Sequence, residues 1–274
     1  MKLQRMLLIL LAVIVSLSTG THQARSQTAP DTIYQQMTHT ERAAFISAQA
    51  RRIAREMSGT EYDFTASFEG HIQQAVDQYA RRVGNNAGDS LGKGDARFVF
   101  ERGQAQAPTL IAAFKAHHLS PLIGLYIPWI ESEYVNIQSP NSAGAMGMFQ
   151  FLPRTGEHFG LAAPDLLDVG KSAGAAARYI TDSLDIFKND PMKEALALLS
   201  YNRGAQQTVH DLQALVNDQN KQCSICALTA DRSKLDETFR RENDFYVPRF
   251  FAAAIIGENP RAFGLAAQPL SKQQ

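Results

Sequence analysis

The sequence predicts a mainly α-helical protein. Apolar residues recur at intervals of three and four along most of the chain, a pattern that places them on one face of a helix. No convincing run of alternating apolar and polar residues indicates a β-strand, and no segment repeats. The 274 residues include 27 Lys and Arg and 27 Asp and Glu. This balance gives no long-range attraction for nucleic acid or for an anionic membrane.

Residues 1–20 have the features of a secretory signal peptide. Lys2 and Arg5 precede an apolar run from Met6 to Val15, and small residues follow as far as Gly20. This order is typical of a signal that is removed on export. The run is shorter than the roughly 18 apolar residues of a spanning helix, although an uncleaved inner-membrane anchor stays an alternative. We therefore expect a periplasmic protein.

Residues 21–95 predict a leader followed by an N-terminal helical region. Residues 21–37 are rich in Gln, Thr, Ser and Ala, which favours a flexible segment. Thr38 and Glu41 have the spacing of a capping box at a helix start. Two amphipathic helices follow, with apolar faces that contain Ile46, Ala50, Ile53, Ala54 and Met57, and Phe68, Ile72, Ala75, Val76, Tyr79 and Val83. Each face needs a partner surface, which could be the rest of this chain or an envelope protein.

The Gly- and Asn-rich residues 84–95 favour turns and predict the boundary to a second region, residues 96–268. Pro108 is expected in the first turn of a helix, and Pro121 at the start of the next helix. That second helix contains Pro128 and could bend there. Later helices are predicted around residues 173–187, 192–200 and 209–216, and from Pro248 onward.

Glu131 stands in an apolar run, residues 126–134. Burial disfavours an ionised carboxylate, so Glu131 could act as a proton donor near neutral pH. Glu133 lies two positions on and would point to nearly the opposite side of a helix, so we interpret it as a solvated surface charge. Asp165 and Asp168 precede a predicted helix and are interpreted as caps.

Two further clusters follow, at residues 142–153 and 197–204. With Glu131 and Ser132 they give Glu-Ser, Gly-x-x-Gln and Ala-x-x-x-Tyr-Asn-x-Gly in order. This arrangement resembles the soluble lytic transglycosylase family over about residues 98–265. Residues 245–248 and 256–265 make the membrane-bound lytic murein transglycosylase D branch the most similar.

The resemblance implies a lysozyme-like helical catalytic domain that cleaves the MurNAc–GlcNAc β-1,4 bond of peptidoglycan glycan strands without water. Glu131 would protonate the glycosidic oxygen and then accept the proton of the C6 hydroxyl of the same muramyl sugar. An intramolecular hydroxyl has a high effective concentration, and the product ends in 1,6-anhydro-MurNAc. Neither a cofactor nor a metal is implied.

The resemblance also assigns substrate-side residues. It implies that the Tyr201 hydroxyl approaches the catalytic carboxyl, with a core tyrosine as the alternative. Asn202 would bind substrate amides or close its helix, and Gln150 would supply a substrate-side amide. Gly147 would let the backbone approach the sugar, and Phe149 would form a sugar-facing wall. The spacing to Gln150 is about one residue longer than usual, so either Ser139 or Ser142 could lie beside the glycan.

Cys223 and Cys226 are the two cysteines of the chain. In an oxidising compartment the pair predicts a local disulfide, whereas a redox site or half a zinc site are the alternatives. Two rival functions also stay open. One is a hydrolytic muramidase, which needs a second carboxylate or a bound water opposite Glu131. The other is a catalytically weak peptidoglycan-binding protein of envelope assembly.

Overall fold

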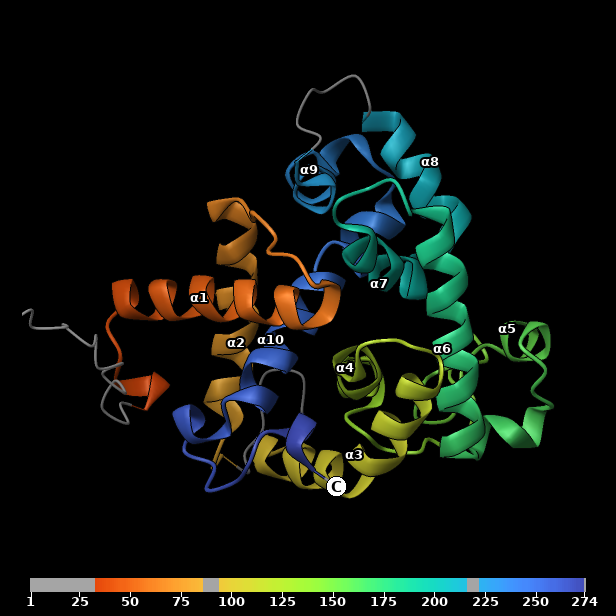
Figure 1. Cartoon of the computed structure of the whole chain (residues 1–274), viewed down its shortest axis with the longest axis horizontal. Helices are drawn as coiled ribbons and strands as arrows, with labels where there is room; N and C mark the ends of the chain where they lie inside the picture. The colour runs from red at the N-terminus through yellow and green to blue at the C-terminus, as the bar shows by residue number, and fades with distance from the viewer. Residues whose placement is uncertain (1–32, 86–93, 216–221, 274) are drawn as a thin grey trace, which may run out of the picture. The chain divides into compact units, whose positions relative to one another are not determined.

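The structure, a computed structural model, describes residues 33–85, 94–215 and 222–273. These residues are mainly α-helical, as predicted, and contain no strand beyond isolated bridges that pair Ile137 with Gly147 and Met146 with Phe151. The helices are α1 His39–Ser58, α2 Ala66–Arg82, α3 Ala96–Ala116, α4 Pro121–Ser132, α5 Pro153–His158, α6 Val169–Ile186, α7 Lys193–Arg203, α8 Ala205–Leu215, α9 Ser224–Ala230 and α10 Tyr246–Glu258 (Figure 1).

The predicted signal peptide, most of the leader and the centre of the Gly-rich boundary lie outside the described residues. Within the described ranges, no helix combines the length and the apolar character needed to cross a membrane.

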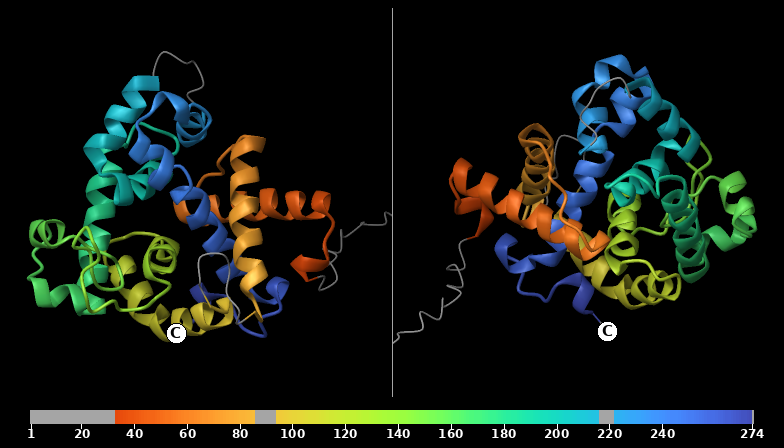
Figure 2. Two further views of the ribbon diagram at one scale, coloured as in Figure 1. Left: turned by 180° about the vertical axis from the view of Figure 1, so that it is seen from behind. Right: turned by 45° about the horizontal axis from the view of Figure 1, so that its top comes forward.

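Helix α1 begins with the predicted capping box. The Thr38 Oγ1 accepts a hydrogen bond from the Glu41 amide at 3.3 Å, and the Thr38 amide donates to Glu41 Oε2 at 2.7 Å. Helix α2 lies along α10, and α1 packs against both (Figures 1 and 2). Ile53 and Phe68 are fully buried there. The apolar faces of the N-terminal helices are therefore covered by the rest of this chain.

Helix α3 begins earlier than expected. Asp95 caps it by accepting a hydrogen bond from the Arg97 amide at 2.9 Å, and the helix continues through Pro108. The prediction that Pro108 opens a helix was wrong. A proline inside a helix removes one hydrogen bond, and here the burial of Phe100, Ala107 and Leu110 on the same helix offsets that loss.

Helix α4 is apolar and buried along almost its whole length, from Leu122 to Ile130. At Gly124 the helix comes so close to α3 that an added Cβ would lie 2.2 Å from a ring carbon of Phe114. Pro128 lies inside α4, which continues to Ser132. The close approach packs α4 directly against α3 at this point.

A buried carboxylate joins α4 to the C-terminal part of the chain. The Tyr126 hydroxyl donates to Glu258 Oε1 at 2.5 Å, and the Ser271 hydroxyl donates to Glu258 Oε2 at 2.5 Å. Glu258 is 6% exposed. A carboxylate in such a place is stable only when its oxygens accept hydrogen bonds, so these three residues fix the position of α4 relative to α10.

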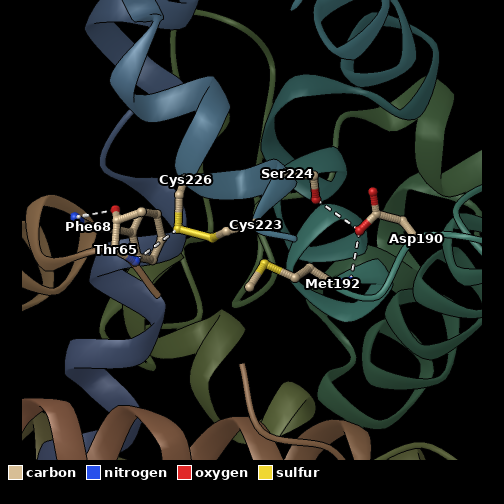
Figure 3. Close-up of a disulfide and its surroundings, with 7 residues drawn as sticks. All are labelled: Thr65, Phe68, Asp190, Met192, Cys223, Ser224 and Cys226. Atoms are coloured by element: carbon tan, nitrogen blue, oxygen red, sulfur yellow. Dashed lines mark hydrogen bonds between the residues drawn. A yellow bond between two sulfur atoms is a disulfide. The ribbon is translucent and has the colours of Figure 1, made fainter. Parts of the chain in front are cut away.

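The disulfide between Cys223 and Cys226 lies at the start of α9, with the two Cα atoms 5.1 Å apart (Figure 3). The Thr65 amide, at the cap of α2, donates to the Cys226 Sγ at 3.4 Å. The Ser224 hydroxyl donates to Asp190 at 2.9 Å (Figure 3). The disulfide turn thus contacts α2 on one side and the segment before α7 on the other.

Glu133 is not a solvated surface charge, and that prediction was wrong. It ends α4 in the left-handed conformation at φ 52°, which turns its side chain toward α2. Both Glu133 carboxylate oxygens accept from the guanidinium of Arg82, at 2.7 and 2.9 Å. The side chains are 3% exposed for Arg82 and 15% for Glu133. Hydrogen bonding in two places compensates the burial of both charges.

Replacing Glu133 by Gln should therefore destabilise the protein, because it removes the carboxylate that accepts two hydrogen bonds from the buried Arg82 guanidinium. Loss of one member of a buried ion pair costs about 3 kcal/mol. The measurement is the free energy of unfolding in denaturant. Glu237→Gln is the matched control, since its pair with Arg241 is 74% and 70% exposed and surface pairs contribute little. Equal stability of the two variants would contradict the prediction.

Candidate active site

Glu131 lies near the C-terminal end of α4, half-buried among apolar neighbours that include Trp129 and Ile130. Burial raises the pKa of its carboxyl group to about 7, and a hydrogen bond from Tyr246 and the charge of Arg249 act in the opposite direction. The burial effect is the largest of the three. A carboxyl group with this pKa is partly protonated at neutral pH and can both donate and accept a proton.

Tyr246 is the first residue of α10 and donates its hydroxyl hydrogen to Glu131 Oε1 at 2.6 Å. Its side chain is 1% exposed, so the bond is shielded from water. The resemblance implies that the Tyr201 hydroxyl approaches this carboxyl group, whereas the hydrogen bond to it comes from Tyr246. The signal that could have found Tyr246 is residues 245–248, which carry part of the family resemblance but were given no role in the site.

The Tyr201 hydroxyl donates instead to the backbone carbonyl of Phe149, at 2.9 Å. Its ring packs against Phe151 and Tyr179. Burial and, to a smaller extent, the negative charge of Glu131 raise the pKa of Tyr201. Tyr201 therefore lies near the carboxyl group but serves to hold the loop of residues 145–151.

Phe149 is fully buried in the core, so the prediction that it forms a sugar-facing wall was wrong. The reason is local. Ser132 Oγ donates to the carbonyl of Met148 at 2.7 Å, and Tyr201 donates to the next carbonyl. With both carbonyls held toward α4 and α7, the Phe149 side chain turns into the apolar interior.

Gly147 is required by packing inside the protein. Its φ is 75°, and a Cβ would lie 2.1 Å from the carbonyl oxygen of Leu166. The close approach seen at Gly147 is to Leu166, and its approach to the sugar stays a prediction. Gln150 also has a positive φ, 51°, and its Nε2 donates to the Gly147 carbonyl at 2.8 Å. Its Oε1 accepts from Asn141 at 3.3 Å, so the amide stiffens its own loop.

Ser139 and Ser142 are both exposed. Among the described residues, neither forms a hydrogen bond with Glu131, and the choice between them as a substrate contact stays a prediction.

Asn202 joins the end of α7 to the π-helical turn η4, Phe239–Asn243. Its Nδ2 donates to Asn243 Oδ1 at 2.9 Å and to the Glu242 carbonyl at 3.3 Å. The next residue, Arg203, donates to Asp211 at 2.8 Å and to Asp236 at 2.6 Å. Arg203 fixes this motif in place, a role that the sequence did not suggest because it occupies a variable position of the pattern.

The motif at the end of α7 borders two hollows. One, of about 670 Å³, lies between α5, α6 and α8 and touches Gly204, His158 and Tyr179. The other, of about 500 Å³, is lined by Asn202, by the π-helical turn and by residues of α2 and α10. Asn202 and Gly204, which lie two residues apart, therefore line different hollows.

Glu131 is the one carboxyl group of the described residues that combines burial with a pKa raised toward neutrality. Asp165 and Asp168 serve as the predicted caps: Asp168 accepts from the Lys171 amide at 2.9 Å, and Asp165 from the Ala162 amide at 3.0 Å. No three His, Cys, Asp or Glu side chains of the described ranges come together as a metal site would require.

A comparison with protein families gives a match for the central part of the chain. The family model described as the Transglycosylase SLT domain matches residues 109–223. These are 115 of the 274 residues of the chain, and they are similar to that domain. The family comprises lytic transglycosylases, which are glycosidic bond lyases, so the chain is an enzyme of this class that acts on peptidoglycan. No curated protein matches the chain. The SLT domain contains Glu131 and Tyr201, whereas Tyr246 and Arg249 lie beyond the matched residues.

Replacing Tyr246 by Phe should raise the pKa of Glu131, because the lost hydrogen bond stabilises the ionised carboxylate. The decline of kcat/KM at alkaline pH, which reports loss of the acid, should then move to higher pH. Tyr201→Phe is the control, since the Tyr201 hydroxyl donates to a backbone carbonyl. In this variant kcat/KM should decline at the same pH as in the unmodified enzyme. An unchanged or lower midpoint for Tyr246→Phe would refute the role of this bond.

Glu131 should also make stability depend on pH. Its pKa is about 7 in the folded protein against an ordinary value of 4.5, so the folded state binds the proton more tightly and loses stability as pH rises between these values. Glu131→Gln removes this loss. At pH 8 the Glu131→Gln variant should have the higher melting temperature. At pH 4 the two melting temperatures should be equal, or that of the unmodified protein should be higher. A difference independent of pH would exclude a raised pKa.

Proposed function

We propose that the enzyme cleaves the MurNAc–GlcNAc β-1,4 bond without water and leaves 1,6-anhydro-MurNAc ends. The observation that carries this proposal is Glu131 itself, a half-buried carboxyl group with a pKa of about 7 and no acidic group among the influences on it. Hydrolytic glycosidases of this kind use two carboxyl groups. A mechanism in which one group acts twice matches the described residues better.

In this mechanism, protonated Glu131 gives its proton to the glycosidic oxygen while the bond from C1 to that oxygen breaks. The resulting carboxylate then accepts the proton of the C6 hydroxyl as O6 bonds to C1. No water is consumed, and Glu131 ends protonated as it began. The attack is intramolecular, which raises the effective concentration of the nucleophile. Tyr246 binds Oε1, so Oε2 is the oxygen available to exchange the proton.

Within the lytic transglycosylases, we place the chain nearest the membrane-bound lytic murein transglycosylase D branch. Residues 245–248 and 256–265 support this placement, and the first of them contain Tyr246, which contacts the catalytic carboxyl. We also propose a periplasmic location, on the basis of the signal-like residues 1–20. The apolar residues of the N-terminal helices are buried against this chain, so these faces give no reason to propose an envelope partner.

The muramidase alternative requires a base to activate water opposite Glu131. The carboxylates nearest in sequence are engaged elsewhere, since Glu133 binds Arg82 and Asp165 and Asp168 cap backbone amides. None of them is among the groups that influence the Glu131 pKa. A non-hydrolytic reaction is therefore the better proposal.

Replacing Glu131 by Gln should abolish release of muropeptides from purified sacculi, because Gln can neither donate nor accept the proton. General acid–base catalysis is worth about 10²- to 10⁴-fold, and here one group serves both steps. Mass spectrometry of the products reads the chemistry directly: anhydro ends are lighter by one water than reducing ends. Near-normal release by Glu131→Gln would overturn the role of Glu131, and reducing ends from the unmodified enzyme would identify a muramidase.

A further inference from the structure

The cavity of about 500 Å³ beside the catalytic centre is built by parts of the chain outside the SLT domain match, apart from Asn202. Gln74 and Gln78, one helical turn apart on α2, form one wall, and Arg249 of α10 contributes to the other. Helices α2 and α10 pack side by side (Figure 1). The N-terminal helices therefore contribute directly to a hollow next to the site.

Arg249 is the chemically unusual member of this cavity. Its Nε is sealed from solvent and has no hydrogen-bond partner, and within the described residues its guanidinium makes no ion pair. The residue is partly exposed and its charge acts on Glu131, so an anion bound in the cavity would be a second partner for this guanidinium. The guanidinium carbon lies 6.0 Å from the ring centre of Tyr246, the residue that binds Glu131. An anion on Arg249 would thus lie one side chain away from the catalytic carboxyl.

The rest of the lining has the chemistry of a peptide-binding site. The lining contains Arg241, Arg249 and Glu242, and so one more positive than negative charge. Arg241 also lies 3.8 Å from Glu237, so Arg249 is the arginine left for a ligand. The amides of Gln74 and Gln78 are exposed and can donate to and accept from peptide groups. Neutral sugars offer no group that needs a guanidinium. A guanidinium instead suits a carboxylate, which it can bind through two parallel hydrogen bonds.

We propose that this cavity binds the peptide stem carried by the muramyl sugar, with Arg249 on a stem carboxylate and the α2 amides on the peptide backbone. This inference rests on the proposed function, because it takes peptidoglycan as the substrate. The enzyme would then prefer peptide-bearing strands to bare glycan. The preference would come from helices α2 and α10, which the SLT domain match does not include.

The test measures binding by calorimetry in the Glu131→Gln protein, so that no ligand is cleaved. Four ligands are compared: a peptide-bearing tetrasaccharide, the same compound with its stem carboxylates amidated, an amidase-treated tetrasaccharide with a free lactyl carboxylate, and chitotetraose. Adding Arg249→Gln should raise the dissociation constant of the first ligand about 10- to 100-fold, the usual value of charged hydrogen bonds. It should change the dissociation constants of the amidated ligand and of chitotetraose less than twofold.

Two further variants keep the test decisive if Arg249→Gln folds poorly. Gln78→Ala, on the opposite wall, should weaken peptide-bearing ligands about threefold to tenfold and leave chitotetraose unchanged. Arg261→Gln, at an exposed arginine distant in sequence from the cavity lining, should change none of the four. Circular dichroism melting reports the folding of each variant.

Three results would overturn the proposal. The first is an equal loss for the amidated and the carboxylate ligands. The second is an equal loss for the lactyl ligand, which would assign Arg249 to the lactyl group. The third is unchanged binding; if Arg249→Gln in the otherwise unmodified enzyme then shifts only the pH profile of kcat, Arg249 acts through Glu131 alone. A muramidase-type product would overturn the reaction while leaving these binding results valid.

Discussion

The burial of one carboxyl group at the end of an apolar helix is the constraint on which the rest of the site depends. Helix α4 has no polar face, so it must be surrounded, and α3 and α10 cover it. Covering limits the contact of Glu131 with water and raises its pKa to about 7. It also creates a cost, because an ionised carboxylate in this place needs a donor. Tyr246 meets that need on one oxygen and leaves the other for chemistry.

The same solution occurs elsewhere in the core with a structural outcome. Tyr126 donates to Glu258 at 2.5 Å, and Tyr62 donates to Glu194 at 2.8 Å. Glu258 differs from Glu131 because Ser271 occupies its second oxygen. A carboxylate with both oxygens engaged is a fixed joint between helices. Glu131 has one oxygen engaged by Tyr246, and its other oxygen can take and return a proton.

The sequence predicted the fold class, the capping box at Thr38, the helix that carries Glu131 and the caps at Asp165 and Asp168, because each depends on local spacing. The failures share a different cause. Phe149 was assigned by its position in a motif, whereas its orientation depends on backbone carbonyls that accept hydrogen bonds from Ser132 and Tyr201. Arg82 and Glu133 lie 51 positions apart, and no local sequence pattern predicts such an ion pair. The cavity on α2 and α10 is likewise visible only in three dimensions.

The bonds of Glu258 set an order in which the site can be completed. The chain is synthesised from its N-terminus, so α4 exists before Tyr246 and before the Glu258–Ser271 contacts that hold it. Until those residues have been made, Glu131 has neither its shield from water nor its hydroxyl partner. The proton-transfer group acquires its properties last, and a partly synthesised chain carries the whole SLT domain match without a working acid.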